Sequence, residues 1–250
     1  MRPPAGTGEV DRLFGELLRT GDDPDALQHL LSRPEPDETT LLAVLRRAVP
    51  IAFLEHLGTS APWISRPRVL GGVARNPRTP RALALRLLPA LFWRDLADVA
   101  ASPRLSIAIR SRAEGHLKEM LPDMRLGARV TLAKLATPAV LIPLLADPEP
   151  RVVSGALTNP RLREDDLLSA LRGRTVSPVL IAEAASSFRW KEAYGVRLEL
   201  ALQPRTPLAI ALGQLSSLVT RDLGRVASTE GLVPLLQAAA SRVAEDRGKP

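Results

Sequence analysis

The side chains best suited to chemistry in this chain are its arginines. Basic residues number 34 against 27 acidic ones, for a formal net charge of +7, and the only lysines are Lys118, Lys134, Lys191 and Lys249. A guanidinium group makes paired hydrogen bonds to a carboxylate or a phosphate, so this bias points to an anionic partner. A GC-rich genome would produce the same bias with no functional demand, and that alternative stays open.

Six arginines recur in pairs at an almost constant interval. The pairs are Arg46 with Arg172, Arg78 with Arg205, and Arg94 with Arg221. Equivalent positions of a stacked repeat protein fall on equivalent faces, so these residues are candidate partner-binding residues that would form a basic ladder.

A structural explanation of the same arginines is open as well. Arg78 and Arg205 follow predicted helix ends, where a cation favours the helix dipole and free carbonyls. Asp95 and Asp222 stand next to the third arginine pair, where an aspartate can cap the following helix. Under this explanation the repeated charges stabilise helix ends and bind no partner.

Two tryptophans, Trp63 and Trp190, recur at the same interval, and each stands close to a basic residue. Exposed tryptophans anchor interfaces, whereas buried ones fill the joints between helices. We include both among the candidate partner-binding residues and favour the packing role.

Residues for catalysis or for a cofactor are not grouped in the sequence. His29, His56 and His116 lie far apart without zinc-ligand spacing, and cysteine is absent, which excludes thiolate sites. The pair Gly71-Gly72 lacks the other glycines of a phosphate loop. We therefore expect no catalytic residue, no metal and no cofactor; a hydrolase site assembled from distant polar residues is the third and weakest hypothesis.

The interval that relates these pairs is an internal repeat. Residues 74–105 align with residues 201–232 at an offset of 127 without a gap, with 16 identities in 32 positions. Upstream, residues 31–46 match residues 157–172 after a slip of one position. The alignment indicates a tandem duplication with a second copy truncated at its C-terminal end.

Proline marks the turns inside each copy. Asn76, Asn159 and Gln203 each precede a proline, which disfavours the α conformation in the residue before it and so ends a helix. Thr79 and Thr206 are then predicted to cap the next helix, with the following proline in its first turn. Inside that helix the two copies share the apolar positions Ala84, Leu88, Leu91 and Ala211, Leu215, Leu218, whose spacing predicts one buried face.

These patterns predict an all-α protein made of short helices. Leucine- and alanine-rich segments recur between 23 prolines, and aromatic residues make up only 3% of the chain. We expect an N-terminal tail and capping helix at 1–23, a first repeat block at 24–150 and a second at 151–250, together one continuous α-solenoid. No basic and apolar leader precedes them and no apolar segment is long enough for a membrane span, so a cytoplasmic location is expected.

The motifs also carry a resemblance. The turn N-P-R-T-P, the repeated R-D-L and the segment GALTNPRLREDDLL at 155–168 resemble bacterial helical-repeat proteins of the HEAT and leucine-rich-variant kind, over about residues 25–243. The resemblance implies an α-solenoid with an extended binding surface and brings no catalytic residues. Leucine-rich-variant proteins can hold an iron–sulfur cluster through cysteines, and this chain has none, so no cofactor is inferred from the likeness.

The sequence thus predicts a non-enzymatic scaffold or adaptor that binds another macromolecule, in the first place a protein, through a face of successive repeats. The alternative is binding of nucleic acid by its phosphate backbone on an arginine-rich face, with HEAT-like DNA glycosylases as the type of helical solenoid that acts on bases. The low aromatic content weakens this alternative, because single-stranded nucleic acid is bound largely by stacking on aromatic side chains.

Overall fold

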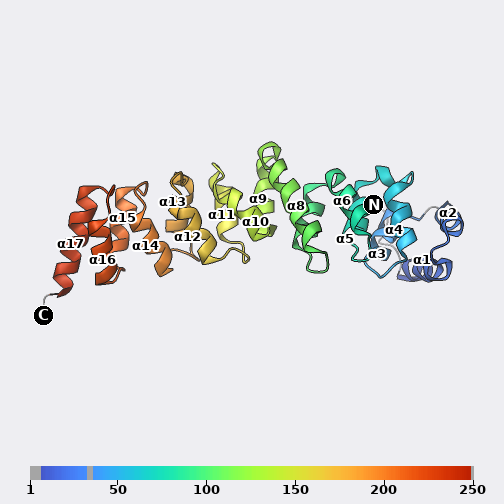
Figure 1. Cartoon of the computed structure of the whole chain (residues 1–250), viewed down its shortest axis with the longest axis horizontal. Helices are drawn as coiled ribbons and strands as arrows, with labels where there is room; N and C mark the ends of the chain where they lie inside the picture. The colour runs from blue at the N-terminus through green and yellow to red at the C-terminus, as the bar shows by residue number, and fades with distance from the viewer. Residues whose placement is uncertain (1–6, 33–35, 249–250) are drawn as a thin grey trace. The chain divides into compact units, whose positions relative to one another are not determined.

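The computed structural model describes residues 7–32 and 36–248, and within these ranges the chain forms α-helices and short 3-10 helices but no β-strand (Figure 1). The all-α prediction is therefore confirmed. Contacts divide the chain into two compact units, one up to Pro122 and one from Asp123 onward.

Unit 1 contains eight α-helices and two 3-10 turns among its described residues. They are α1 (Thr7–Thr20), α2 (Pro24–Ser32), α3 (Glu38–Val44), α4 (Ile51–Thr59), η1 (Trp63–Ser65), α5 (Pro67–Arg75), α6 (Arg81–Leu87), η2 (Leu88–Ala90), α7 (Trp93–Ala101) and α8 (Ile107–Met120). Helices α1, α3, α5 and α7 pack against one another in that order, and α2, α4, α6 and α8 do the same. The unit thus has two rows of helices, which the chain enters alternately.

Unit 2 follows a similar plan. It contains α9 (Leu126–Leu135), α10 (Pro138–Leu145), α11 (Pro150–Leu157), α12 (Glu164–Arg172), α13 (Pro178–Ser186), α14 (Tyr194–Leu202), α15 (Leu208–Leu215), α16 (Thr220–Ser228) and α17 (Pro234–Gly248). The 3-10 turn η3 (Leu121–Asp123) stands at the border of the two units. Helices α9, α11 and α13 pack in succession, as do α10, α12, α14 and α16, while α15 packs against α17.

Helix boundaries recur at the interval found in the sequence. Helix α5 begins at Pro67 and α14 at Tyr194, and α7 begins at Trp93 and α16 at Thr220, so each pair is 127 positions apart. The same interval separates the first residues of α4 and α13 and of α8 and α17. The block boundary expected at Pro150 is the first residue of α11, inside unit 2, so the compact units and the sequence blocks divide the chain differently.

The shared apolar positions are buried, as predicted. Ala84 and Leu88 are fully inaccessible, and their counterparts Ala211 and Leu215 are nearly so. In unit 2 these residues belong to a cluster with Leu223 and apolar residues of α14 and α17. The helix is shorter than predicted, because α6 ends at Leu87 and α15 ends at Leu215. Leu88 and Leu91 lie in and directly after the turn η2, and Leu218 lies after α15. The spacing thus identified buried positions but not one side of a single helix.

The predicted threonine caps are wrong. Helix α6 begins at Arg81 with Pro80 in the N-cap position, and the Thr79 hydroxyl donates instead to the carbonyl oxygen of Val73 in α5 at 2.6 Å. Thr206 is likewise not the cap, because Pro207 holds that position in front of α15. Proline has a backbone fixed near the N-cap conformation, so the helix begins one residue later than expected.

Asn76 and Gln203 do end α5 and α14, as predicted, and each occupies the C-cap position. Their side chains also form hydrogen bonds to an earlier helix end, which the sequence does not predict. The Asn76 Nδ2 donates to the carbonyl oxygens of Leu45 at 2.8 Å and Arg47 at 2.9 Å, while its Oδ1 accepts from the N–H of Arg78 at 2.9 Å. One buried amide therefore joins the end of α5 to the end of α3, its neighbour in the same row.

Asn159 repeats this contact in unit 2. Its Nδ2 donates to the carbonyl oxygens of Ala133 at 2.8 Å and Ala136 at 3.1 Å, and its Oδ1 accepts from the N–H of Arg161 at 2.9 Å. The amide thus connects the ends of α9 and α11. An amide suits this position because it carries both donors and an acceptor.

Candidate functional site

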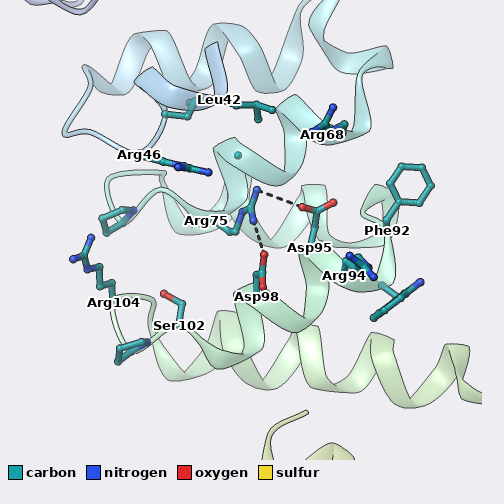
Figure 2. A pocket seen from close by; sticks show the side chains of 15 residues that line it. Leu42, Arg46, Arg68, Arg75, Phe92, Arg94, Asp95, Asp98, Ser102 and Arg104 are labelled. Carbon is teal, nitrogen blue, oxygen red and sulfur yellow. Dashed lines mark hydrogen bonds and ion pairs between the residues drawn. The ribbon is translucent and has the colours of Figure 1, made fainter. Parts of the chain in front are cut away.

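A groove of about 920 Å³ crosses three successive helices of one row in unit 1, from the end of α3 over α5 to α7 and the turn after it (Figure 2). Five arginines line it: Arg46, Arg68, Arg75, Arg94 and Arg104. Two aspartates, Asp95 and Asp98, are the acidic lining residues. The groove therefore carries an excess of positive charge.

Arg75 is the centre of the groove and is already paired. Its Nη1 lies 2.5 Å from Oδ2 of Asp98, and its Nη2 lies 3.4 Å from Oδ1 of Asp95. Figure 2 shows this triad in the middle of the view, between Arg46 and Arg104 on one side and Phe92 and Arg94 on the other. The triad fixes the floor of the groove and joins α5 to α7.

Asp95 is set apart from ordinary surface carboxyls by its surroundings. Burial raises the pKa of Asp95 above its usual value, and the positive charge of Arg75 opposes that rise. The side chain rests directly on α5, because a Cβ at Gly71 would lie 2.6 Å from Oδ1 of Asp95. Glycine at position 71 is therefore what allows α7 to bring this carboxyl onto α5.

Three groove arginines are left without an acidic partner. Among the described residues, none forms a hydrogen bond or ion pair with the guanidinium groups of Arg46, Arg94 and Arg104, all of which belong to exposed residues. Arg94 stacks over the ring of Trp93 at 5.2 Å, whereas Arg68 is bound to Glu38 at 2.9 Å. Arg46, Arg94 and Arg104 are available to a ligand.

One rim of the groove is aromatic. Phe92 is 57% exposed although it is a large apolar side chain, and it lies next to Trp93 at the start of α7. Both residues line the groove. Exposed aromatic rings beside arginines have the composition of interface cores.

The six arginines predicted from the repeat are all exposed, but their contacts differ. Arg46 and Arg94 lie in the groove, whereas Arg78 is not among its lining residues. Arg172 pairs with Glu199 at 2.7 Å, and Arg205 donates to the carbonyl oxygen of Val176 at 3.3 Å. Arg221, at the start of α16, is exposed in unit 2.

The two tryptophans are packed inside their units. Trp63 is 1% exposed and Trp190 is 5% exposed. The Trp190 Nε1 donates to the carbonyl oxygen of Leu157 at 2.8 Å. An arginine covers each ring, Arg66 over Trp63 at 4.7 Å and Arg189 over Trp190 at 4.2 Å. Burial favours the packing role over the anchoring role, and we leave both indoles out of the candidate interface.

The predicted aspartate caps are corrected by the structure. The N-cap of α7 is Phe92 and that of α16 is Val219, and neither makes a side-chain cap. Asp95 and Asp222 lie within the first turn, where a carboxylate still favours the helix dipole. Asp222 accepts a hydrogen bond from the Tyr194 hydroxyl at 2.5 Å, so each aspartate reaches the preceding helix of its row.

The most informative groove residues were missed by reasoning from the repeat. Arg75, Asp98, Phe92 and Arg104 have Leu202, Arg225, Val219 and Gly231 at the equivalent positions of the second block. Residues shared by the two aligned segments therefore do not include them. The signal that identifies them is the opposite one, namely a change of charge or size between aligned positions.

Within the described ranges, no three carboxylates or histidines are close enough together to hold a metal ion. No helix in these ranges combines the length and apolarity needed to cross a bilayer. Comparisons with protein-family models, with curated proteins and with solved structures give no match. The groove is therefore the feature of the described residues that bears on function.

Proposed function

We propose that this chain is an α-solenoid of the HEAT-like kind, duplicated in tandem, that acts as a non-enzymatic scaffold or adaptor and binds another protein through one face of its repeats. The alternating rows of helices in each unit and the recurrence of helix boundaries at 127 positions support the architecture. Repeats stacked in one direction present neighbouring helices of one row to the same partner.

The observation that carries the proposal is the course of the groove. Its lining comes from three successive helices of one row, α3, α5 and α7, and not from a single loop or a closed cavity. An open surface assembled from several repeats suits an extended macromolecular segment. Free arginines and an exposed phenylalanine on it are residue types enriched at protein interfaces.

The test is proximity labelling in the native cell with a biotin ligase fused to the chain, followed by reconstitution of the complex from purified components. The expected result is a protein that is labelled above a ligase-only control and that co-elutes with the chain in size-exclusion chromatography. Failure to recover any stable protein partner, together with turnover of a small substrate that a point substitution abolishes, would contradict the proposal.

Nucleic acid is the second candidate, and the five arginines of the groove are the observation in its favour. Phosphate binding depends steeply on salt because each contact releases counterions. A polarisation titration of labelled DNA and RNA at several salt concentrations separates the two candidates. Absence of binding at about 50 mM salt excludes nucleic acid, since non-specific binding is strongest at low salt.

A further inference from the structure

The groove of unit 1 differs in charge from the equivalent surface of unit 2. Arg46 has its counterpart in Arg172, which lies next to Glu199 and pairs with it at 2.7 Å. Position 72, the counterpart of Glu199, is glycine. In unit 1 the arginine has therefore kept its place while the acidic residue that would neutralise it is missing.

The other groove positions change in the same direction. The five lining arginines of unit 1 stand against two aspartates. The equivalent positions of unit 2 carry three arginines and three acidic residues, namely Arg172, Arg221, Arg225, Glu199, Asp222 and Glu230. Asp222 accepts a hydrogen bond from the Tyr194 hydroxyl and forms an ion pair with Arg225 at 2.9 Å. The second surface neutralises itself, whereas the first retains a positive excess.

The centre of the groove indicates what kind of anion fits. Asp98 is paired on one side by Arg75, yet its side chain is 57% exposed, so an oxygen remains open to a donor from a ligand. A phosphodiester backbone carries hydrogen-bond acceptors only, so it offers no donor to this oxygen. A peptide offers backbone N–H donors as well as carboxylates.

The aromatic rim adds a requirement for an apolar group. Phe92 is 57% exposed, and its counterpart Val219 is 53% exposed but much smaller. The ligand should therefore carry carboxylates for the free arginines and an apolar side chain for Phe92. A ligand that bound by charge alone would leave Phe92 without a contact.

We propose that the α3–α5–α7 groove binds an extended acidic segment of the partner protein, in which carboxylates meet Arg46, Arg94 and Arg104 and an apolar side chain packs on Phe92. This inference rests on the proposed function and names the partner chemistry at one site. It assigns binding to the first block, because the equivalent surface of the second block carries as many acidic as basic residues and two of its three arginines, Arg172 and Arg225, are already paired.

The test is selection of a random-peptide phage library on the immobilised full chain. Enriched peptides are resynthesised with a fluorescent label and titrated by polarisation. We expect enrichment of glutamate or aspartate together with apolar residues. Because complementary charges across an interface set association rate and specificity, the double variant Arg46→Glu with Arg94→Glu should weaken binding by about tenfold or more. All of these side chains are exposed, so the variant should melt like the parent.

The second block supplies matched controls. Arg172→Glu with Arg221→Glu makes the same charge change at equivalent positions and should leave peptide affinity within about twofold, because rim charges outside a site act only at long range. Phe92→Ala should weaken binding, and Val219→Ala should not. Rising salt should weaken the peptide complex.

Three outcomes would overturn the inference. One is that no peptide is enriched or that the enriched peptides are basic. Another is that acidic peptides bind equally well to the groove variant and to the control variant. The third is that labelled oligo-dT, and no acidic peptide, depends on Arg46 and Arg94. If the partner found by proximity labelling still binds the groove variant, the proposed function stands and only the site is wrong.

Discussion

Asn76 and Gln203, 127 positions apart, form the same contact: each donates through its side-chain nitrogen to a leucine carbonyl oxygen at the end of an earlier helix in its row. The distance is 2.8 Å from Asn76 to Leu45 and 2.6 Å from Gln203 to Leu171. Glutamine is one methylene longer than asparagine, and yet the target carbonyl is equivalent. Position and hydrogen-bonding capacity are thus retained while side-chain length varies.

This contact predicts a stability loss on truncation. Asn159→Ala would leave the carbonyls of Ala133 and Ala136 without their side-chain donor in a buried site, and we expect a loss of about 2 kcal/mol in the free energy of unfolding. Asn76→Ala should behave alike. Urea denaturation measures both, with Ser154→Ala on the exposed side of α11 as the control. Unchanged midpoints would show that the amides do not hold the helices together.

A charge on the shared apolar face should unfold its unit. Leu88→Asp and Leu215→Asp each place a carboxylate in a site that is at most 3% exposed, which should cost about 3 kcal/mol or more. Thermal denaturation followed by circular dichroism is the measurement. Ile107→Asp is the control, because Ile107 is 72% exposed in the first turn of α8. Parental melting of both core variants would contradict the assignment of this face.

Asp95 and Asp222 occupy equivalent positions and should titrate on opposite sides of 3.8, the ordinary value of an aspartate. Burial raises the pKa of Asp95. The hydrogen bond from Tyr194, followed by that from Arg225, lowers the pKa of Asp222. NMR titration of the side-chain carboxyl carbons measures both. A single shared midpoint would disprove the difference.

The two shifts have opposite consequences for stability. Asp222 contributes stability that is present above its unfolded pKa and is lost as the pH falls through its folded pKa. The contribution of Asp95 is present below its unfolded pKa and is lost as the pH rises through its folded pKa. Asp222→Asn should therefore flatten the acid side of the stability profile more than Asp95→Asn does, which denaturation at a series of pH values would show.

Trp190→Phe should destabilise the chain without altering any surface charge. The substitution removes the hydrogen bond to Leu157 and leaves a buried carbonyl oxygen unsatisfied, and it weakens the contact with Arg189. We expect a loss of about 1–2 kcal/mol in urea denaturation. The same substitution at the groove residue, Trp93→Phe, provides the comparison, because the Trp93 indole lines the groove and does not fill a joint between helices. Equal stability of Trp190→Phe and the parent would remove the packing role.

Local patterns predicted the helices well because apolar spacing and proline act over a few residues. The sequence placed Leu88 and Leu215 in the core and ended helices at Asn76 and Gln203, and the structure agrees. The cap predicted at Thr79 is wrong, because the Thr79 hydroxyl donates back to the carbonyl oxygen of Val73 in α5. The choice between two local hydrogen bonds of similar strength is not determined by residue type.

The groove was only partly predictable, because it depends on contacts between helices distant in sequence. Arg46 and Arg94 were found because they recur, while Arg75 and Phe92 were missed because they do not. Which arginine is free depends on whether an acid lies beside it in space, as Glu199 does beside Arg172 and Asp98 beside Arg75. Composition counts charges without showing these pairings.

The amide contacts reach back only 23 to 32 residues, from each asparagine or glutamine to a helix end in the same row. Every such bond therefore closes a short loop of chain, with a modest entropic penalty. Under mechanical tension the molecule should yield in small steps, one joint at a time, and a joint that has opened can close again without waiting for distant parts of the chain to meet.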